Sequence, residues 1–176
     1  MKPLTSSSRR NAATPTRRLE KPKITTFLTF NNQAEEAAKL YTSVFKSSKI
    51  VSSMYYGDAG PGPKGSLLTA TISLDGQELM LLNGGPSFTF TQGMSLFVSC
   101  ETQEEIDAYW QKLTAGGKEV QCGWLVDRFG VSWQIVPSIL GKLLGDKDQQ
   151  KAGRVMQAMM KMVKLDIRGL QQAAEG

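Results

Sequence analysis

The side chain that most often carries out acid–base chemistry at neutral pH is absent from this sequence. The 176 residues include no histidine, which excludes histidine metal ligands, histidine general bases and a Ser-His-Asp triad. Two cysteines remain: Cys100 ends an apolar run, and Cys122 lies beside a glycine that permits close approach of a ligand. Activating a thiolate without histidine needs a nearby cation or helix end. Cys122 is therefore either a cavity-facing thiol or an inert loop cysteine.

The chain also has two glycine-rich runs, GDAGPGPKG at residues 57–65 and NGGP at residues 83–86. Each leads towards a strand or a loop. A nucleotide cradle instead needs a glycine-rich turn that opens a helix, so that backbone N–H groups at the helix N-terminus face the anion. Neither run therefore predicts a nucleotide site.

The positive charge of the chain is concentrated at its N-terminus. The formal net charge is +5, but residues 1–23 hold seven Lys/Arg and one acid, which leaves fourteen basic and fifteen acidic residues over 24–176. A protein that binds nucleic acid needs basic residues clustered on its folded surface, so we expect no nucleic-acid partner. No apolar run approaches the roughly 18–20 residues of a membrane span, and we expect no membrane association.

Residues 1–23 are rich in Ser, Thr, Arg and Pro and poor in large apolar side chains, a composition typical of disorder. The segment also resembles an organelle transit peptide, which is Arg-rich, Ser-rich and acid-poor. The alternatives are a flexible extension or an over-long gene start. Two cysteines are too few for a disulfide framework and fit a reducing compartment. We expect the cytoplasm, or an organelle if the segment is a transit peptide.

The first half of the remaining chain combines period-two strands with one amphipathic helix. The Asp75-Gly76 dipeptide between two apolar runs favours the positive φ of a tight hairpin turn. The expected elements are strands over 24–30 and 49–56, a helix over 34–45, and a hairpin of 67–74 with 77–83.

The second half repeats this order. Thr102 and Glu105 form a capping box, the signature of a helix start. The expected elements are strands over 94–100, 118–124, 125–127 and 131–136, a helix from residue 103 to Gly116, and helices over 138–174 capped by Asp148 and Asp166. Asp127 and Arg128, at the last hairpin, either pair across an open cavity or are ordinary turn residues.

The halves align at an offset of 69 residues, with Tyr41 on Trp110 and Val44 on Leu113. A fixed offset that matches strand, cap and helix stripe indicates a duplicated unit. The sequence therefore predicts an α+β domain of two βαβββ modules, at about 24–86 and 93–137, within a single domain over 24–176.

Three stretches carry a family resemblance: FLTFNNQAEEAAKLYTSVF, GQELMLLNGGPSFTFT and CETQEEIDAYWQKLTAGGKEVQCGWLVDRFGVSWQIVP. They resemble the PhnB-like branch of the glyoxalase/vicinal-oxygen-chelate superfamily, whose members often carry the label 3-demethylubiquinone-9 3-methyltransferase. The resemblance spans residues 24–172. It implies a curved, cup-shaped mixed sheet of the glyoxalase/bleomycin-resistance type, and commonly a homodimer.

In metal-dependent relatives, His, Gln or Glu ligands come from the first and last strands of each module. The resemblance carries the first-strand positions onto Thr26 and Ser95, and the last-strand positions onto Gln134 and onto Leu79 or Met80. Hydroxyls, an amide and a hydrocarbon are a poor ligand set for a divalent ion. We therefore expect no metal and no cofactor.

The same resemblance places Trp133 beside the cavity, where it either stacks on a ligand or belongs to the core. The candidate ligand-binding residues are Thr26, Ser95, Trp133, Gln134 and Cys122. The resulting hypothesis is a metal-free protein that binds a small molecule. The alternatives are a metal-dependent lyase or dioxygenase, a methyltransferase as the label says, and an interaction module without a ligand.

Overall fold

The computed structural model describes residues 23–176. Residues 1–22, which carry almost all of the predicted disordered or targeting segment, lie outside the described part of the chain. The described chain folds into two four-stranded sheets and five helices, so the predicted α+β architecture of two βαβββ modules is confirmed.

The first module forms a sheet in the order β1-β4-β3-β2, in which β1 and β4 are parallel and the other pairs antiparallel. Its elements are β1 (Thr26–Phe30), α1 (Ala34–Val44), β2 (Lys49–Tyr55), β3 (Leu67–Leu74) and β4 (Gln77–Asn83). The predicted hairpin turn is confirmed, because Asp75 (φ 45°) and Gly76 (φ 87°) both take the left-handed backbone that such a turn requires.

The second module repeats this topology in the order β5-β8-β7-β6. Its elements are β5 (Leu96–Cys100), α2 (Gln103–Thr114), β6 (Lys118–Glu119), β7 (Trp124–Val126) and β8 (Ser132–Pro137). The predicted cap of α2 is confirmed: the Thr102 side chain accepts a hydrogen bond from the Glu105 N–H at 3.3 Å.

The strand predicted over 118–124 is wrong. It breaks after Glu119 because Cys122 (φ 59°) and Gly123 (φ 81°) adopt left-handed backbone, which no strand accommodates. Their N–H groups donate instead to the carbonyls of Met162 and Val163, each at 2.8 Å. This backbone contact ties the C-terminal segment to the second module.

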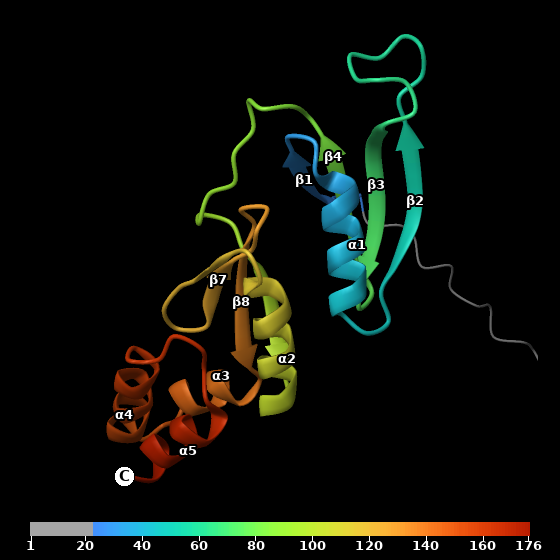
Figure 1. Cartoon of the computed structure of the whole chain (residues 1–176). Helices are drawn as coiled ribbons and strands as arrows, with labels where there is room; N and C mark the ends of the chain where they lie inside the picture. The colour runs from blue at the N-terminus through green and yellow to red at the C-terminus, as the bar shows by residue number, and fades with distance from the viewer. Residues whose placement is uncertain (1–22) are drawn as a thin grey trace, which may run out of the picture.

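Three C-terminal helices follow, α3 (Ile139–Leu144), α4 (Gln149–Met159) and α5 (Ile167–Glu175). The predicted caps Asp148 and Asp166 are confirmed, because both carboxylates accept backbone N–H groups of the helix they open. The three helices share a small apolar core around Val155, Leu165 and Leu170 and lie at the end of the second module (Figure 1).

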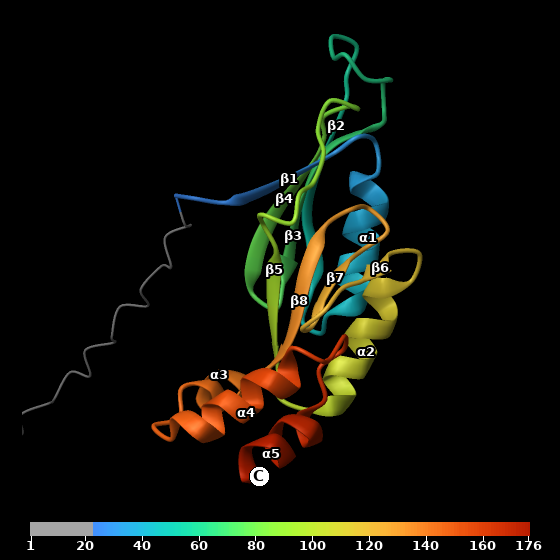
Figure 2. The same ribbon diagram turned by 90° about the vertical axis from the view of Figure 1, so that its left-hand side faces the viewer.

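Helices α1 and α2 lie on one side of the two sheets, and the turned view shows no helix on the opposite side of the first sheet (Figure 2). The main core fills the space between these helices and the strands. We call the sheet surface opposite α1 and α2 the free face. Phe27 and Met80 occupy adjacent positions on it. Phe27, Met54 and Phe97 are 47%, 60% and 60% exposed, which is unusual for large apolar side chains on strands.

Candidate functional site

The first strands of the two modules, β1 and β5, are edge strands of their sheets, and two cavities lie along the boundary between the modules. We call this boundary the seam. The smaller cavity measures about 240 Å³ and is bordered by β1, β5, the start of β8 and the linker over residues 89–94. Five hydroxyl side chains border it, and its other walls are apolar: Thr26, Thr89, Thr91, Ser95 and Ser132. We call it the hydroxyl cavity.

Two of the five predicted ligand-binding residues border the hydroxyl cavity, and a third is hydrogen-bonded to one of them. Thr26 reaches it from β1, and Ser95 reaches it from the position just before β5. Gln134 lies on β8 beside Phe97 in the parallel register, and its Nε2 donates to the Ser95 Oγ at 2.8 Å. The amide thereby fixes the position of the Ser95 hydroxyl, and Ser95 keeps its own hydrogen for a further acceptor.

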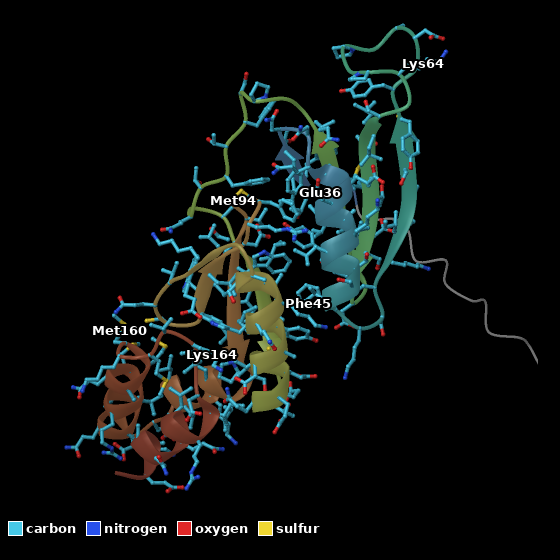
Figure 3. All side chains as sticks on the ribbon, in the orientation of Figure 1. Glu36, Phe45, Lys64, Met94, Met160 and Lys164 are labelled. Atoms are coloured by element: carbon cyan, nitrogen blue, oxygen red, sulfur yellow. The ribbon has the colours of Figure 1, made fainter. Side chains whose placement is uncertain are left out.

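A larger cavity of about 570 Å³ continues along the seam between β4, β5 and α2. Phe45, Tyr109 and Trp133 give it aromatic walls, and the Phe45 and Trp133 rings stack with centroids 5.4 Å apart. Figure 3 shows Phe45 at the end of α1 that lies next to α2. Burial raises the pKa of the Tyr109 hydroxyl, with a smaller contribution from the carboxylate of Glu105. Tyr109 is therefore a neutral hydroxyl at physiological pH.

Trp133 belongs to the core more than to a cavity, since only 1% of its surface is exposed. Its Nε1 donates to the Asp127 Oδ2 at 2.9 Å, and the Tyr41 hydroxyl donates to the same oxygen at 2.6 Å. The Asp127 Oδ1 accepts the N–H groups of Phe129 and Val131 at 2.9 and 3.0 Å. Burial, with the adjacent carboxylate, raises the pKa of Tyr41 well above its usual range.

Asp127 is thus a turn residue, since its Oδ1 accepts the Phe129 N–H and its carbonyl accepts the Gly130 N–H, but it is buried and is not the partner of Arg128. The residue is 3% exposed, and two of the four hydrogen bonds to its carboxylate, from Tyr41 and Trp133, join α1 of the first module to β8 of the second. The other two hold the turn before β8. The Arg128 guanidinium lies instead over the Phe129 ring, 4.8 Å from its centroid. Sequence reasoning missed this contact because Tyr41 is distant in the chain.

Cys122 lies away from both cavities. Its sulfur is 3.7 Å from the Met160 Sδ, on the side of the second module where the C-terminal segment docks. Cys100 is fully buried, and burial raises the pKa of its thiol to about 12, with the carboxylates of Glu105 and Glu101 contributing. Neither thiol is placed beside the hydroxyl cavity.

The two thiols are expected to differ sharply in reactivity. At pH 8 a thiol reagent such as 5,5′-dithiobis(2-nitrobenzoate) should modify Cys122 and leave Cys100 intact, because Cys100 is both inaccessible and protonated. Absorbance should report one thiol per native chain and two per unfolded chain. The Cys122→Ser variant, which should show no reactive thiol when native, is the control. Rapid reaction of both thiols would mean that the end of β5 is open.

The donor set does not fit the divalent ion found in metal-dependent members of this fold. Thr26 pairs with Leu79 in the β1–β4 register, so a hydrocarbon stands where a ligand would be needed. The Gln134 amide offers only one neutral oxygen, because its Nε2 donates to Ser95. Among residues 23–176 no group of three or more His, Cys, Asp or Glu side chains is placed to hold a metal. Hydroxyl and amide groups alone bind divalent ions poorly.

The glycine-rich runs do not fit adenosylmethionine either. The N–H groups of Gly84 and Gly85 donate to the carbonyls of Phe30 and Asn31, and the Gly65 N–H donates to the Tyr56 carbonyl. These backbone donors are engaged in joining strands, so they do not form an anion cradle. No helix follows Gly85 directly, because a coil leads to β5.

The sequence model of the family described as 3-demethylubiquinone-9 3-methyltransferase matches residues 22–136. The chain is 45% identical to a protein from Bacillus cereus described as a putative 3-demethylubiquinone-9 3-methyltransferase, PhnB protein. That match covers 66% of this chain and 99% of the other, with a TM-score of 0.62. The chain belongs to this PhnB-like family.

Two further solved structures resemble this PhnB-like chain. Protein PA1353 from Pseudomonas aeruginosa is 23% identical, over 66% of this chain and 96% of that one, with a TM-score of 0.53, and so shows the shared fold. A glyoxalase/bleomycin resistance protein from Albidiferax ferrireducens T118 is 15% identical over 61% and 91% of the two chains, with a TM-score of 0.42. No curated protein matches the chain.

The family match ends at the last residues of β8, so helices α3–α5 lie outside it. None of the helices within residues 23–176 has the length and apolar character needed to cross a membrane.

Proposed function

We propose that this PhnB-like protein binds a small organic molecule at the seam without a metal ion, and that it works as a homodimer. The observation that carries the proposal is the hydroxyl cavity, where Thr26 and Ser95 converge from the two modules and Gln134 orients Ser95. Concave sites with apolar walls and a few placed polar groups are typical of small-molecule binding.

The chemistry of the seam supports binding more than catalysis. The hydroxyl cavity is bordered by no acid, base or thiol, and general acid–base or nucleophilic catalysis needs such a group within hydrogen-bond reach of the substrate. The titratable groups of the seam border the larger cavity instead, and include Lys46 and Asp75. Its other two carboxylates each accept a hydrogen bond from a protein donor, Glu101 from Ser138 and Glu105 from the Glu101 N–H. Both carboxylates therefore have structural partners.

The exposed apolar side chains of the free face support the homodimer. Phe27 and Met54 are exposed on the first sheet and Phe97 on the second. All seven residues of the edge strand β2 are exposed. Apolar patches and unpaired strand edges of this kind are normally covered by a partner. A second copy of the chain would cover both modules and enclose the seam.

The binding proposal is tested by thermal stabilisation, because a ligand that binds only the folded state raises the Tm through mass action. The panel comprises divalent ions, adenosylmethionine, quinones, aldehyde–thiol adducts and antibiotics. We expect one class of organic compound to raise the Tm, and the divalent ions and adenosylmethionine to leave it unchanged.

Two matched variants connect the result to the seam. Ser95→Ala removes the hydroxyl that Gln134 orients and should reduce the stabilisation by the active compound. Ser53→Ala removes an exposed hydroxyl from β2, which borders neither cavity of the seam, and should not. A Tm shift that requires a divalent ion would favour a lyase or dioxygenase, and a shift with adenosylmethionine would favour a methyltransferase. The absence of any shift would favour an interaction module.

A further inference from the structure

Ser132, at the start of β8, has an unusual environment. Its side chain is 2% exposed, and its Oγ is the one buried side-chain oxygen or nitrogen within residues 23–176 that has no hydrogen-bond partner. Buried hydroxyls in native proteins are almost always paired, because an unpaired one has lost its water without gaining a substitute. Ser132 also borders the hydroxyl cavity. Its Oγ is closed off from solvent as the side chain stands, and a rotation about the Cα–Cβ bond is the movement that would bring the unpaired hydroxyl to the contents of that cavity.

The cavity around Ser132 contains no charged side chain. Its border consists of five hydroxyl residues and six apolar ones, the latter Phe27, Leu28, Phe90, Met94, Leu96 and Val131. An ion placed there would lose part of its hydration without meeting an opposite charge, which is unfavourable. A neutral polar group would lose little, because hydroxyls both donate and accept.

The serine hydroxyls of the cavity also have unused hydrogen-bond donors and acceptors. Ser95 accepts a hydrogen bond from Gln134 and retains its own O–H, and Ser132 retains both its O–H and its lone pairs. An oxygen atom of a ligand can therefore accept from these serines and, if it carries hydrogen, donate back. The apolar border then surrounds the remainder of a small molecule.

We propose that Ser132 anchors the ligand of this protein, and that the ligand is a small uncharged molecule in which a hydroxyl or carbonyl oxygen is attached to an apolar body. This inference rests on the proposed function and adds the residue and the ligand class. The volume of about 240 Å³ is below the usual 300–1,000 Å³ of drug-sized sites, so the group held here is compact.

Three probes of nearly equal size and shape test the ligand class: benzyl alcohol, which is neutral, benzoate, which is anionic, and benzylammonium, which is cationic. Their dissociation constants are measured by NMR titration of the full-length protein at neutral pH. Benzyl alcohol is expected to shift the resonances of residues bordering the hydroxyl cavity and to bind at least tenfold more tightly than either ion. Equal or tighter binding of benzoate or benzylammonium would overturn the inference.

The Ser132→Ala variant tests the anchor, with Ser53→Ala, on β2 and away from both cavities, as the matched control. Because the Ser132 hydroxyl has no partner in the protein, its removal is expected to leave the Tm of the ligand-free protein unchanged or to raise it by about 2–4 °C. The same change should weaken benzyl alcohol at least tenfold. If Ser132→Ala does not fold, Ser132→Cys keeps the volume with a weaker donor and should weaken benzyl alcohol as well.

Two further results would reject the inference. A lowered Tm of ligand-free Ser132→Ala would show that the hydroxyl has a partner within the protein. Unchanged benzyl alcohol affinity in that variant would show that Ser132 holds at most an ordered water. If a panel compound still stabilises the protein and Ser132→Ala does not weaken it, the inference fails while the proposed function stands. If no panel compound stabilises the protein, the proposed function itself fails.

Discussion

The Asp127→Ala variant is expected to lose about 4 kcal/mol of its free energy of unfolding, towards the upper limit for a point substitution. The buried carboxylate accepts four hydrogen bonds, from Tyr41, Trp133 and two backbone N–H groups. Alanine would leave these donors buried without an acceptor, and each such donor costs about 1–3 kcal/mol. Since Tyr41 lies on α1 and Trp133 on β8, the loss should also loosen the contact between the modules.

Urea denaturation followed by circular dichroism measures this loss. Tyr41→Phe is the matched control, because it removes one of the four donors and keeps the ring, and should cost about 2 kcal/mol. An Asp127→Ala variant as stable as Tyr41→Phe would show that the carboxylate is not the connection between the modules.

The second large effect is expected in the oligomeric state. Light scattering should give the wild-type protein a mass of twice the 19.3 kDa of one chain. Met54→Asp and Phe97→Asp each place a carboxylate on the free face, one in each sheet. Burying that charge in a dimer interface is unfavourable. The dissociation constant of the dimer should therefore rise at least about a hundredfold, which corresponds to about 2.8 kcal/mol. Both variants should therefore elute as monomers.

Met156→Asp is the control for this experiment. Met156 is a 44% exposed methionine on α4, outside the two sheets. The control should remain dimeric. A wild-type mass near one chain would contradict the homodimer, and monomerisation by Met156→Asp alone would place the interface on the C-terminal helices.

Local sequence signals predicted the elements of the fold. The Asp75-Gly76 turn, the Thr102 cap and the Asp148 and Asp166 caps are each decided by a few neighbouring residues, and the structure has all of them. The prediction of a strand over 118–124 was wrong because the backbone there is decided by residues far away in the chain. The left-handed backbone of Cys122 and Gly123 is held by the carbonyls of Met162 and Val163, which are distant in the chain.

The candidate site also contains residues that the sequence predicted and residues that only the folded structure reveals. The resemblance placed Thr26, Ser95 and Gln134, and the structure brings them to one end of the seam. It does not bring Cys122 there, and it packs Trp133 into the core. Ser132 lies two residues before Gln134, hence on the same face of β8, a relation that period-two counting would have found. Whether the Ser132 hydroxyl has a hydrogen-bond partner depends on all the elements packed around it. A local sequence pattern therefore cannot predict that the partner is missing.

Mass spectrometry of the intact complex tests the metal-free binding site most directly. The protein is purified without chelator and measured before and after addition of the compound that stabilises it most. We predict the mass of two chains with no metal ion, and the gain of one compound per chain. A metal ion on every chain, without which the compound does not bind, would contradict the account and restore metal-dependent chemistry at the seam.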